Sequence, residues 1–416
     1  MMRFNVYIVF CIIFNCILSQ CDDNMLMFDC DGLEFCNNEA TYGFDCYVNN
    51  EFCEDFNGDG IVDSWVGDGW CDDGEWGFDF QCEEYSFDCG DCGDTFIDTN
   101  GYCQHIPQSF NFFHDGQNRQ YYLYEPESIQ ENAPLIFVLH GYSGSAGGIL
   151  SYAGMNTVAD EHGFAVCYPN GTIDQSNNRF WNVGYAFHQN QTVDDVDFLS
   201  SLAYYLQTEN NYSSEKTFVT GMSNGGDMSY MLGCQADEVF KAIAPVAGCM
   251  MEEIYNTCDS SSMPILEIHG TADNVTLWEG DMENNDGWGA YLSTLDGIDL
   301  WVEQNQCQSS EQIPGPSLDT IHHRYFDCID NTEVWLYEII GGGHDWPAYS
   351  SQEIWGFFSQ FIVSGDINND GSINIQDIIV LINIILESTF ESDADINNDG
   401  IVNILDIVQL VNIILN

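Results

Sequence analysis

The chain has 416 residues, enough for two or three domains, and 45% of them are hydrophobic, which excludes a disordered protein and indicates a packed core. Its 67 acidic residues far outnumber its 6 basic ones, for a formal net charge of −61. Such a surface repels nucleic-acid phosphates and anionic lipids, so neither is an expected partner, and it favours bound divalent cations or a salty medium.

The first twenty residues have the pattern of a secretory signal peptide, with one arginine, an apolar run and a polar exit at Gln20. The apolar run is too short and too early in the chain to span a membrane. Cleavage near Gln20 would leave Cys21 at or near the new N-terminus, where a lipid anchor is the minor alternative. No later apolar stretch is long enough to cross a bilayer. We therefore expect an exported protein, secreted or associated with the cell surface, without a membrane span.

The cysteines support export. Of the 18, two leave with the signal peptide, ten lie within residues 21–103 and six within residues 167–328. An even number in each group of an exported chain predicts two separate disulfide sets. The sequence does not give the pairing, although two pairs are plausible neighbours: Cys249–Cys258 and Cys307–Cys328.

Residues 21–103 are rich in Cys, Asp and Gly and poor in aliphatic runs. Within them, DSWVGDGWCDDGEWGFDFQCEEYSFDCGDC resembles a Notch-type cysteine-rich repeat, in which disulfides and acidic side chains enclose calcium. The resemblance implies four calcium ligands: Asp68, Asp73, Asp88 and Asp91. Just before it, DFNGDGIVD repeats the start of a calcium-loop spacing, but Val66 stands at the twelfth position. The alternative is a disulfide-stapled spacer without a binding role.

Residues 104–363 alternate apolar runs with helix-like segments. Two alternating runs around a His-Asp-Gly turn predict a hairpin at 109–126. Six short apolar runs follow, at 134–141, 164–171, 217–221, 241–248, 264–270 and 333–340. Amphipathic segments such as 193–207 and 288–304 lie between several of them. Buried strands alternating with helices predict an α/β fold, with a mainly parallel sheet covered on both faces.

One stretch of this block predicts a nucleophile. Gly221-Met222-Ser223-Asn224-Gly225 matches the G-x-S-x-G pattern, with a strand before it and a helical pattern after it. So tight a turn leaves no room for side chains beside the serine, hence the glycines, and it lifts the hydroxyl above the sheet. We predict Ser223 as the nucleophile. The alternative is a glycine-rich strand–helix turn that contains an incidental serine.

A nucleophile elbow needs an acid and then a histidine later in the chain. Asp273 follows the strand at 264–270, and His344 follows the strand at 333–340. Their order after Ser223 is the one expected of an α/β-hydrolase. In such a triad His344 takes the proton from Ser223, and Asp273 holds the imidazole in the required tautomer.

Other acidic and histidine residues compete for these roles. His269 lies inside an apolar strand, so we predict a buried structural histidine, and we predict that Asp345 caps the helix that follows it. Asp194 and Asp195 stand at the start of a helix, where carboxylates stabilise free N–H groups, so we assign them no catalytic role.

The oxyanion hole needs two backbone N–H groups. The turn aims the N–H of Asn224 at the reacting carbonyl, and the loop after the strand at 134–141 supplies the second donor in α/β-hydrolases. We therefore predict the backbone N–H groups of Tyr142 and Asn224. His140 is predicted to support this loop and to take no direct part in the chemistry.

The blocks PLIFVLHGYSGSA, MNTVADEHGFAVCYPNGT, FWNVG, VDDVDFL, GMSNGGDMSY, IAPVAG, EIHGTAD and GGGHDWP follow one another as in the polyhydroxybutyrate depolymerase/feruloyl esterase family. The resemblance covers about residues 104–363. It implies an α/β-hydrolase fold, a Ser-Asp-His triad, no catalytic cofactor, and cleavage of esters attached to polymers. Trp181 resembles the aromatic residue that this family has near its active site, with a buried structural tryptophan as the equal alternative. Trp278 is a further candidate substrate contact.

The C-terminal residues contain a repeat. Residues 366–377 and 395–406 are the same loop twice, with oxygen-bearing side chains at positions 1, 3, 5, 9 and 12 and glycine at position 6. This spacing surrounds a calcium ion. The predicted ligands are Asp366, Asn368, Asp370, Asn374 and Asp377 in the first loop, and Asp395, Asn397, Asp399, Asn403 and Asp406 in the second. Each loop runs into an apolar helix.

This duplicated loop–helix resembles type I dockerin modules, which attach secreted enzymes to scaffold partners. The resemblance, over residues 364–416, implies two structural calcium ions and a cohesin-like partner. The usual polar pair after the ninth loop position is replaced by Ile375-Gln376 and Ile404-Leu405, and the helices have no Lys or Arg. A sorting or self-association role is therefore the alternative.

Two classes of function follow. The first is an exported serine esterase that acts on polymer-linked esters, either feruloyl or acetyl esters of polysaccharide or polyhydroxyalkanoate-type polyesters. The second is a non-catalytic extracellular scaffold or adhesion protein with an inert hydrolase domain. The triad, the elbow and the oxyanion loop together favour the enzyme.

Overall fold

The computed structural model describes residues 107–126, 128–258 and 262–362, then 365, 367–368, 373–387, 394, 396 and 401–415, and the backbone of four short strands in the first 106 residues. These four strands are β1 (Leu26–Phe28), β2 (Glu34–Cys36), β3 (Thr95–Ile97) and β4 (Cys103–His105). β1 pairs with β2 and β3 pairs with β4, both antiparallel. The predicted signal peptide and the ligands Asp68, Asp73, Asp88 and Asp91 lie outside the described residues.

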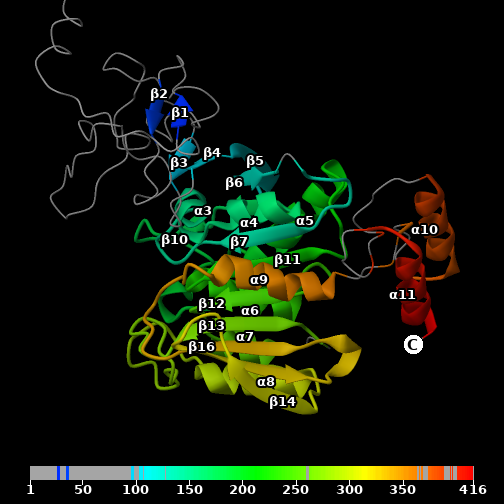
Figure 1. The fold of residues 1–416 in the computed structure, drawn as a ribbon. Helices are drawn as coiled ribbons and strands as arrows, with labels where there is room; N and C mark the ends of the chain where they lie inside the picture. Colours follow the sequence, from blue (N-terminus) through cyan, green and yellow to red (C-terminus); the bar gives the residue numbers. More distant parts are fainter. Residues whose placement is uncertain are drawn as a thin grey trace, which may run out of the picture. The chain divides into compact units, whose positions relative to one another are not determined.

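The chain divides into two compact units, residues 1–106 and 107–416. The second unit is built on a ten-stranded sheet with the order β5-β6-β8-β7-β11-β12-β13-β16-β15-β14 (Figure 1). Its strands are β5 (Gln108–His114), β6 (Gln117–Tyr124), β7 (Leu135–Leu139), β8 (Ala165–Pro169), β11 (Thr217–Met222), β12 (Ile243–Val246), β13 (Ile265–Gly270), β14 (Ser309–Pro314), β15 (Thr320–Phe326) and β16 (Val334–Ile339). In the described part of the chain, no helix combines the length and apolar content that crossing a membrane requires.

The six central strands from β8 to β16 run parallel, and antiparallel strands flank them at both edges. The central strands are the six apolar runs of the sequence. Because both faces of these strands are covered, their residues are almost all buried, as the continuous apolar runs predict. This strand order, with a crossover between β8 and β7, confirms the predicted α/β-hydrolase fold.

Helices cover both faces of the sheet. They are α3 (Ala146–Ala153), α4 (Met155–His162), α5 (Asp195–Glu209), α6 (Asn224–Gln235), α7 (Glu252–Thr257), α8 (Thr294–Gln304) and α9 (Ser350–Phe358). Successive residues of β11 point to opposite faces. Phe218 stacks on Phe358 of α9, with ring centroids 4.8 Å apart, whereas Val219 joins the core formed by α5 to α8. The prediction of a sheet covered on both faces is therefore confirmed.

The edges of the sheet were harder to predict from sequence than its centre. The β5–β6 hairpin turns at Asp115 and Gly116, both with positive φ, as the His-Asp-Gly signal predicts. The antiparallel pair β14–β15 was not predicted, because β14 is mostly exposed and carries no apolar alternation. α8 begins at Thr294, six residues later than the predicted amphipathic segment, because the side chain of Ser293 caps it.

Disulfides join the helical layer in a partly unexpected way. Cys307–Cys328 is confirmed, but the predicted Cys249–Cys258 pair is wrong, because Cys258 bonds to Cys234 instead. Cys234 lies in the last turn of α6 and Cys258 directly follows α7, which packs against α6. Cys249 and the buried Cys167 are free thiols, so the expectation that all six cysteines pair is also wrong.

The C-terminal repeat forms two helices, α10 (Ile375–Glu387) and α11 (Ile404–Leu415), as predicted. They pack around a small apolar core of their own. Its buried members are Ile367, Leu381, Ile384, Ala394, Ile396 and Leu410. The equivalent positions of the two repeats contribute to it, since Ile367 matches Ile396 and Leu381 matches Leu410.

Candidate active site

Ser223 occupies the sharp turn between β11 and α6. Its backbone has φ 56° and ψ −121°, and its N–H donates a hydrogen bond of 2.9 Å to the Val246 carbonyl. Residues other than glycine rarely adopt positive φ, and such strain is concentrated at functional sites. Ser223 therefore has the backbone geometry of a nucleophile elbow at the C-terminal edge of the parallel strands.

The structure explains the two glycines of the motif. A Cβ atom on Gly221 would lie 2.5 Å from the carbonyl oxygen of Gly225, and a Cβ atom on Gly225 would collide with the carbonyl of Leu139. Both clashes involve backbone atoms, which cannot move aside as a flexible side chain can. The predicted steric reason for glycine at both positions is confirmed.

The loop after β7 passes directly over the nucleophile. A Cβ atom on Gly141 would lie 3.9 Å from Ser223 Oγ, and no described residue accepts a hydrogen bond from the backbone N–H of the next residue, Tyr142. The Asn224 side chain is fixed by two bonds to the Trp181 backbone, a 2.7 Å bond accepted by Oδ1 and a 3.1 Å bond donated by Nδ2. Both candidate oxyanion donors thus lie next to the serine. The N–H of Asn224 is adjacent to it in sequence, and the N–H of Tyr142 belongs to the neighbouring loop after β7.

His140 holds this loop in place. Its Nε2 atom accepts a 3.0 Å hydrogen bond from the Gly171 N–H, and its Nδ1 atom lies 2.8 Å from the Gly141 carbonyl. The Trp181 indole N–H donates a 2.9 Å bond to the His140 carbonyl. Burial lowers the pKa of His140 to about 4, so the imidazole is neutral at ordinary pH, with its proton on Nδ1. This agrees with the predicted supporting role.

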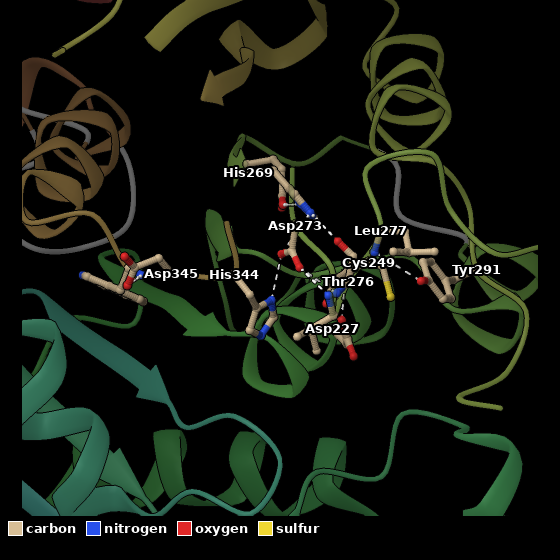
Figure 2. A network of polar contacts seen from close by, with 12 residues as sticks. Asp227, Cys249, His269, Asp273, Thr276, Leu277, Tyr291, His344 and Asp345 are labelled. Atoms are coloured by element: carbon tan, nitrogen blue, oxygen red, sulfur yellow. Dashed lines mark hydrogen bonds and ion pairs between the residues drawn. The ribbon is translucent and has the colours of Figure 1, made fainter. Parts of the chain in front are cut away.

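His344 and Asp273 are joined by a hydrogen bond of 2.7 Å between Nδ1 and Oδ2 (Figure 2). The other carboxylate oxygen of Asp273 accepts the backbone N–H groups of Val275 and Thr276 at 2.8 and 2.9 Å. Burial by itself raises the pKa of Asp273, but these hydrogen bonds and that from His344 hold it below its usual value. Asp273 is therefore an ionised, fixed partner for the imidazole.

No hydrogen bond joins Ser223 Oγ to His344, or to any other described residue. The imidazole nevertheless lies near α6, which begins directly after the serine. Burial raises the pKa of Asp227, in the first turn of α6, to about 6, while the nearby His344 acts to lower it. Catalytic hydrogen bonds are often long in the absence of substrate and tighten when it binds.

The rival residues take other roles. His269 is fully buried, with Nδ1 2.8 Å from Glu267 and Nε2 2.9 Å from the Thr276 carbonyl, so it is a buried, hydrogen-bonded histidine as predicted. Burial lowers its pKa, but the hydrogen bond and charge of Glu267 outweigh burial and raise it. What the sequence did not indicate is that its Nε2 atom also lies 3.5 Å from Asp273 Oδ2.

Asp345 does not cap a helix, so that prediction is wrong. Its carboxylate accepts hydrogen bonds from the Tyr152 hydroxyl and from the Trp346 N–H. Helix α9 begins only at Ser350, and no side chain caps it. The Trp346 and Pro347 turn places Asp345 too far from the helix start, and the Tyr152 hydroxyl binds it instead.

The two aspartates at the start of α5 are structural, as expected. Asp194 is the N-cap and accepts the Asp197 N–H at 2.9 Å. Asp195 is buried and forms a 2.8 Å ion pair with Arg119, and it also accepts the Asn182 N–H. Neither carboxylate is free for catalysis.

The two candidate substrate tryptophans are buried. Trp181 is 0% exposed and Trp278 is 9% exposed, so neither presents a face to a substrate. The prediction that Trp181 contacts the substrate is therefore wrong, and the alternative, a buried structural tryptophan, agrees with the structure. The indole of Trp278 instead packs edge-on against His269, 5.9 Å between centroids.

Sequence reasoning missed an aromatic cluster beside the oxyanion loop. The Tyr142 ring lies 5.7 Å from both Phe187 and Trp288, which are 5.5 Å from each other, and the ring of the buried Tyr185 contacts all three. Phe187 is 49% exposed. The rings come from three separate segments, and no local pattern joins them. The one signal in the sequence is Tyr142 itself, whose predicted role involves only its backbone N–H.

The calcium loops are described in part. Asp377 and Asp406 are fully buried at the start of α10 and α11. Asp377 accepts the N–H groups of Asn374 and Asn368 at 2.7 and 3.1 Å, and Asp406 accepts that of Asn403 at 2.7 Å. The other predicted ligands lie outside the described residues: Asp366, Asp370, Asp395, Asn397 and Asp399.

These carboxylates fit a cation. A buried carboxylate needs a compensating charge, and residues 364–416 contain no Lys, Arg or His. Loop N–H groups satisfy some of the oxygen lone pairs but supply no net charge. The residues present therefore match the calcium loop that the sequence spacing indicates, in which Asp377 and Asp406 stand at position 12.

Comparison with known families identifies both modules. Residues 119–293 match the family model described as Esterase PHB depolymerase, and residues 364–415 match Dockerin type I domain. These matches confirm two of the three resemblances seen in the sequence, those to the esterase family and to the type I dockerin; the Notch-type resemblance falls on residues outside the described part of the chain.

Several curated relatives are esterases. The chain is 24% identical over 261 residues to the bifunctional acetylxylan esterase/xylanase XynS20E of Neocallimastix patriciarum, covering 62% of this chain and 35% of that protein. It is 27% identical over 236 residues to feruloyl esterase B of Piromyces equi, covering 55% and 42%. It is 24% identical over 262 residues to poly(3-hydroxyalkanoate) depolymerase C of Paucimonas lemoignei, covering 58% and 62%. The chain spans less than half the length of the first two.

Among solved structures, the acetyl xylan esterase from Aspergillus awamori is similar with a TM-score of 0.49 and 14% identity, covering 61% of this chain and 99% of that chain.

Proposed function

We propose that this chain is an exported serine carboxylic-ester hydrolase that cleaves polymer-linked esters, with Ser223 as nucleophile, His344 as general base and Asp273 as its partner. The observation that carries the proposal is the 2.7 Å hydrogen bond between His344 and Asp273. It lies at the same edge of the sheet as the strained turn of Ser223. The chain order of the three residues is that of α/β-hydrolases.

In the acylation step, Ser223 Oγ bonds to the carbonyl carbon of the ester while His344 Nε2 takes the hydroxyl proton. The carbonyl oxygen becomes an oxyanion, and the N–H groups of Tyr142 and Asn224 stabilise it. The bond between that carbon and the alkoxy oxygen then breaks. His344 returns the proton to the leaving alcohol, and the acyl group stays on Ser223.

Water completes the cycle by the same route. His344 takes a proton from water as its oxygen attacks the acyl carbon, and then protonates Ser223 Oγ as the carboxylic acid leaves. Asp273 holds the Nδ1–H tautomer and stabilises the imidazolium that forms in each step. Its lowered pKa keeps it ionised throughout.

Feruloyl or acetyl esters of polysaccharide are the proposed substrates. Relatives with those names support this choice. So does the cluster of Tyr142, Phe187 and Trp288 next to the oxyanion loop, because the exposed ring of Phe187 and the half-buried rings of the other two favour contact with an aryl acyl group. The second candidate is a polyhydroxyalkanoate-type polyester, which the matched family model and the depolymerase relative favour. Turnover of methyl ferulate against hydroxybutyrate oligomers separates the two.

The flanking modules serve attachment in this proposal. The dockerin domain binds two calcium ions through its two loops and docks on a cohesin-like scaffold outside the cell. The N-terminal module is proposed to bind a further calcium through Asp68, Asp73, Asp88 and Asp91. Both fit a secreted protein that acts on an insoluble polymer.

The proposal is tested by labelling with a fluorophosphonate probe, which reacts with an activated serine. The unmutated protein should be labelled and Ser223→Ala should not. Asp273→Asn should lower turnover of a soluble ester about 10⁴-fold, the loss typical of the triad acid. Asp296→Asn, at the exposed start of α8, is the matched control and should change nothing. No labelling of the unmutated protein would favour an inert scaffold.

A further inference from the structure

A polar cavity of about 550 Å³ lies next to the oxyanion loop. It is formed by the start of β6, the hairpin of β9 (Thr172–Ile173) and β10 (Arg179–Phe180), and the loop before α5. β6 runs antiparallel to β8, with Tyr121 opposite Pro169. The start of β6 is therefore at the C-terminal edge of the parallel strands, the edge that also carries Ser223.

The cavity and the candidate active site share a wall. The Gly171 N–H, from the cavity lining, donates to His140, which supports the oxyanion loop. The Ser143 N–H, from the oxyanion loop, donates a 2.8 Å bond to the carbonyl of Arg179, which also lines the cavity. A ligand in this cavity would therefore sit beside the group bound at Ser223.

The lining is rich in amide, hydroxyl and guanidinium groups. Its donors include Asn118, Arg119, Gln120, Thr172, Arg179 and Asn190. Two of the six basic residues of this very acidic chain are among them. The volume falls in the range of small-molecule sites and is large enough for one or two sugar rings.

Several of these groups lack a partner. Arg119 is 6% exposed and donates to Asp195 through Nη2, but its buried Nε atom has no hydrogen-bond partner, and neither has Thr172 Oγ1. Arg179 donates a 3.0 Å bond to the Gly171 carbonyl, yet it makes no ion pair within the described residues. The Arg119 Nε and Thr172 Oγ1 atoms are closed off from solvent, so a ligand in the cavity does not reach them, whereas the half-buried guanidinium of Arg179 keeps further donors for a ligand that accepts hydrogen bonds.

Acceptors line the same cavity. Asp115 and Asp194 both contribute to its wall. A negatively charged ligand would meet these two carboxylates, whereas a hydroxyl group both accepts from a guanidinium and donates to a carboxylate. We infer that this cavity is a binding subsite for a neutral sugar unit of the polymer that carries the ester.

The inference rests on the proposed function only for the idea that the bound sugar and the cleaved ester belong to one polymer. Binding of the sugar itself needs no catalysis. It can therefore be measured in the Ser223→Ala background of the full chain, where failure of the esterase proposal leaves the measurement intact.

Titration calorimetry with xylotetraose tests it. We expect Ser223→Ala to bind this neutral oligosaccharide, and we expect Arg179→Met, added to it, to weaken binding at least tenfold, the loss typical of a hydrogen bond from a charged group. Lys241→Met removes a surface cation outside the cavity and is the matched control, with unchanged binding. Asn118→Trp fills the cavity from an exposed position and should also abolish binding.

Unchanged affinity in both Arg179→Met and Asn118→Trp would overturn the inference, since the sugar would then bind elsewhere. Tighter binding of trigalacturonate than of xylotetraose would overturn it too, because the cavity would then select a negative charge. If neither xylotetraose nor trigalacturonate binds at millimolar concentration, the inference is likewise overturned. Labelling of Ser223 by the fluorophosphonate is scored separately and reports only on the esterase proposal.

Discussion

His269 lies directly behind the acid of the candidate triad, with its Nε2 atom 3.5 Å from Asp273 Oδ2, the oxygen that accepts the hydrogen bond from His344. Its other nitrogen pairs with Glu267, which in turn accepts the Tyr230 hydroxyl at 3.0 Å. All of these side chains except the exposed edge of His344 are buried. A continuous polar chain thus runs from the core of the fold to the proposed general base.

His269 is therefore expected to act as a positioning residue for Asp273. His269→Gln should lower kcat about tenfold with little change in KM, because Asp273 loses the imidazole that packs behind its carboxylate while the substrate loses no contact. Steady-state kinetics over a range of pH measures this. Tyr230→Phe removes only the far hydroxyl of the chain and is the control, with kcat unchanged. A variant that is less stable but keeps its kcat and pH profile would reduce His269 to a purely structural role.

The elbow glycines should tolerate no side chain. Gly225→Ala places a Cβ atom against the Leu139 carbonyl, so we expect a loss of stability of about 1–3 kcal/mol or more and loss of activity. Gly147→Ala is the matched control, because a Cβ atom there meets nothing within 4 Å inside α3 and should stabilise the helix by about 0.5–1 kcal/mol. Urea unfolding measures both. Equal stability of the two variants would contradict the steric account.

Stability should fall in acid because of His140. Its pKa, about 4 in the folded protein, lies below the ordinary value of 6.5, so the unfolded chain binds more protons between these values. The contribution is fully present above pH 6.5 and is lost as the pH falls towards 4, for a total of about 3 kcal/mol at most. Urea unfolding from pH 4 to 8 measures the slope. His140→Gln should unfold with a flatter dependence than the unmutated protein over this range, and parallel curves would be inconsistent with a buried neutral imidazole.

The disulfide assignment can be read from peptides. A non-reduced digest should contain Cys234 linked to Cys258 and Cys307 linked to Cys328, and Cys249 should take up an alkylating reagent after unfolding. Each bond closes a loop of 20 to 25 residues, so Cys258→Ser should cost about 3 kcal/mol. Cys249→Ser should cost far less. A peptide joining Cys249 to Cys258 would show the assignment to be wrong.

Calcium removal should unfold the dockerin domain. Asp377 and Asp406 are buried in a segment without basic residues, so chelation removes the cation that stabilises their negative charges. We expect chelation to reduce the helical circular dichroism, calcium to restore it, and magnesium alone to restore much less. Asp377→Asn should weaken calcium binding at least tenfold. Helix content that is insensitive to chelation in the full chain would count against calcium in these loops.

The parts of this protein that local rules govern were predictable from its sequence. The glycines around Ser223 reflect a clash within one turn, the apolar runs reflect strands buried on both faces, and the spacing of the repeats reflects one ion per loop. Each of these leaves a short pattern of residue types along the chain, even where the contacts behind it, such as that of Gly225 with Leu139, are distant in sequence. The order Ser223, Asp273, His344 could be proposed for another reason, because the acid and then the histidine of an α/β-hydrolase triad follow later strands of the same sheet.

Tertiary structure alone decided what depends on packing between distant segments. Trp181 turned out to be buried, Cys258 found Cys234 through the contact of α6 with α7, and β14 joined the sheet without any apolar pattern. The cavity proposed to bind a sugar is the extreme case, because Arg119 and Arg179 come from separate strands and only folding brings both into its lining. The exposure of a side chain and the pairing of cysteines or strands depend on how distant segments pack. The spacing of residues along the sequence does not determine them.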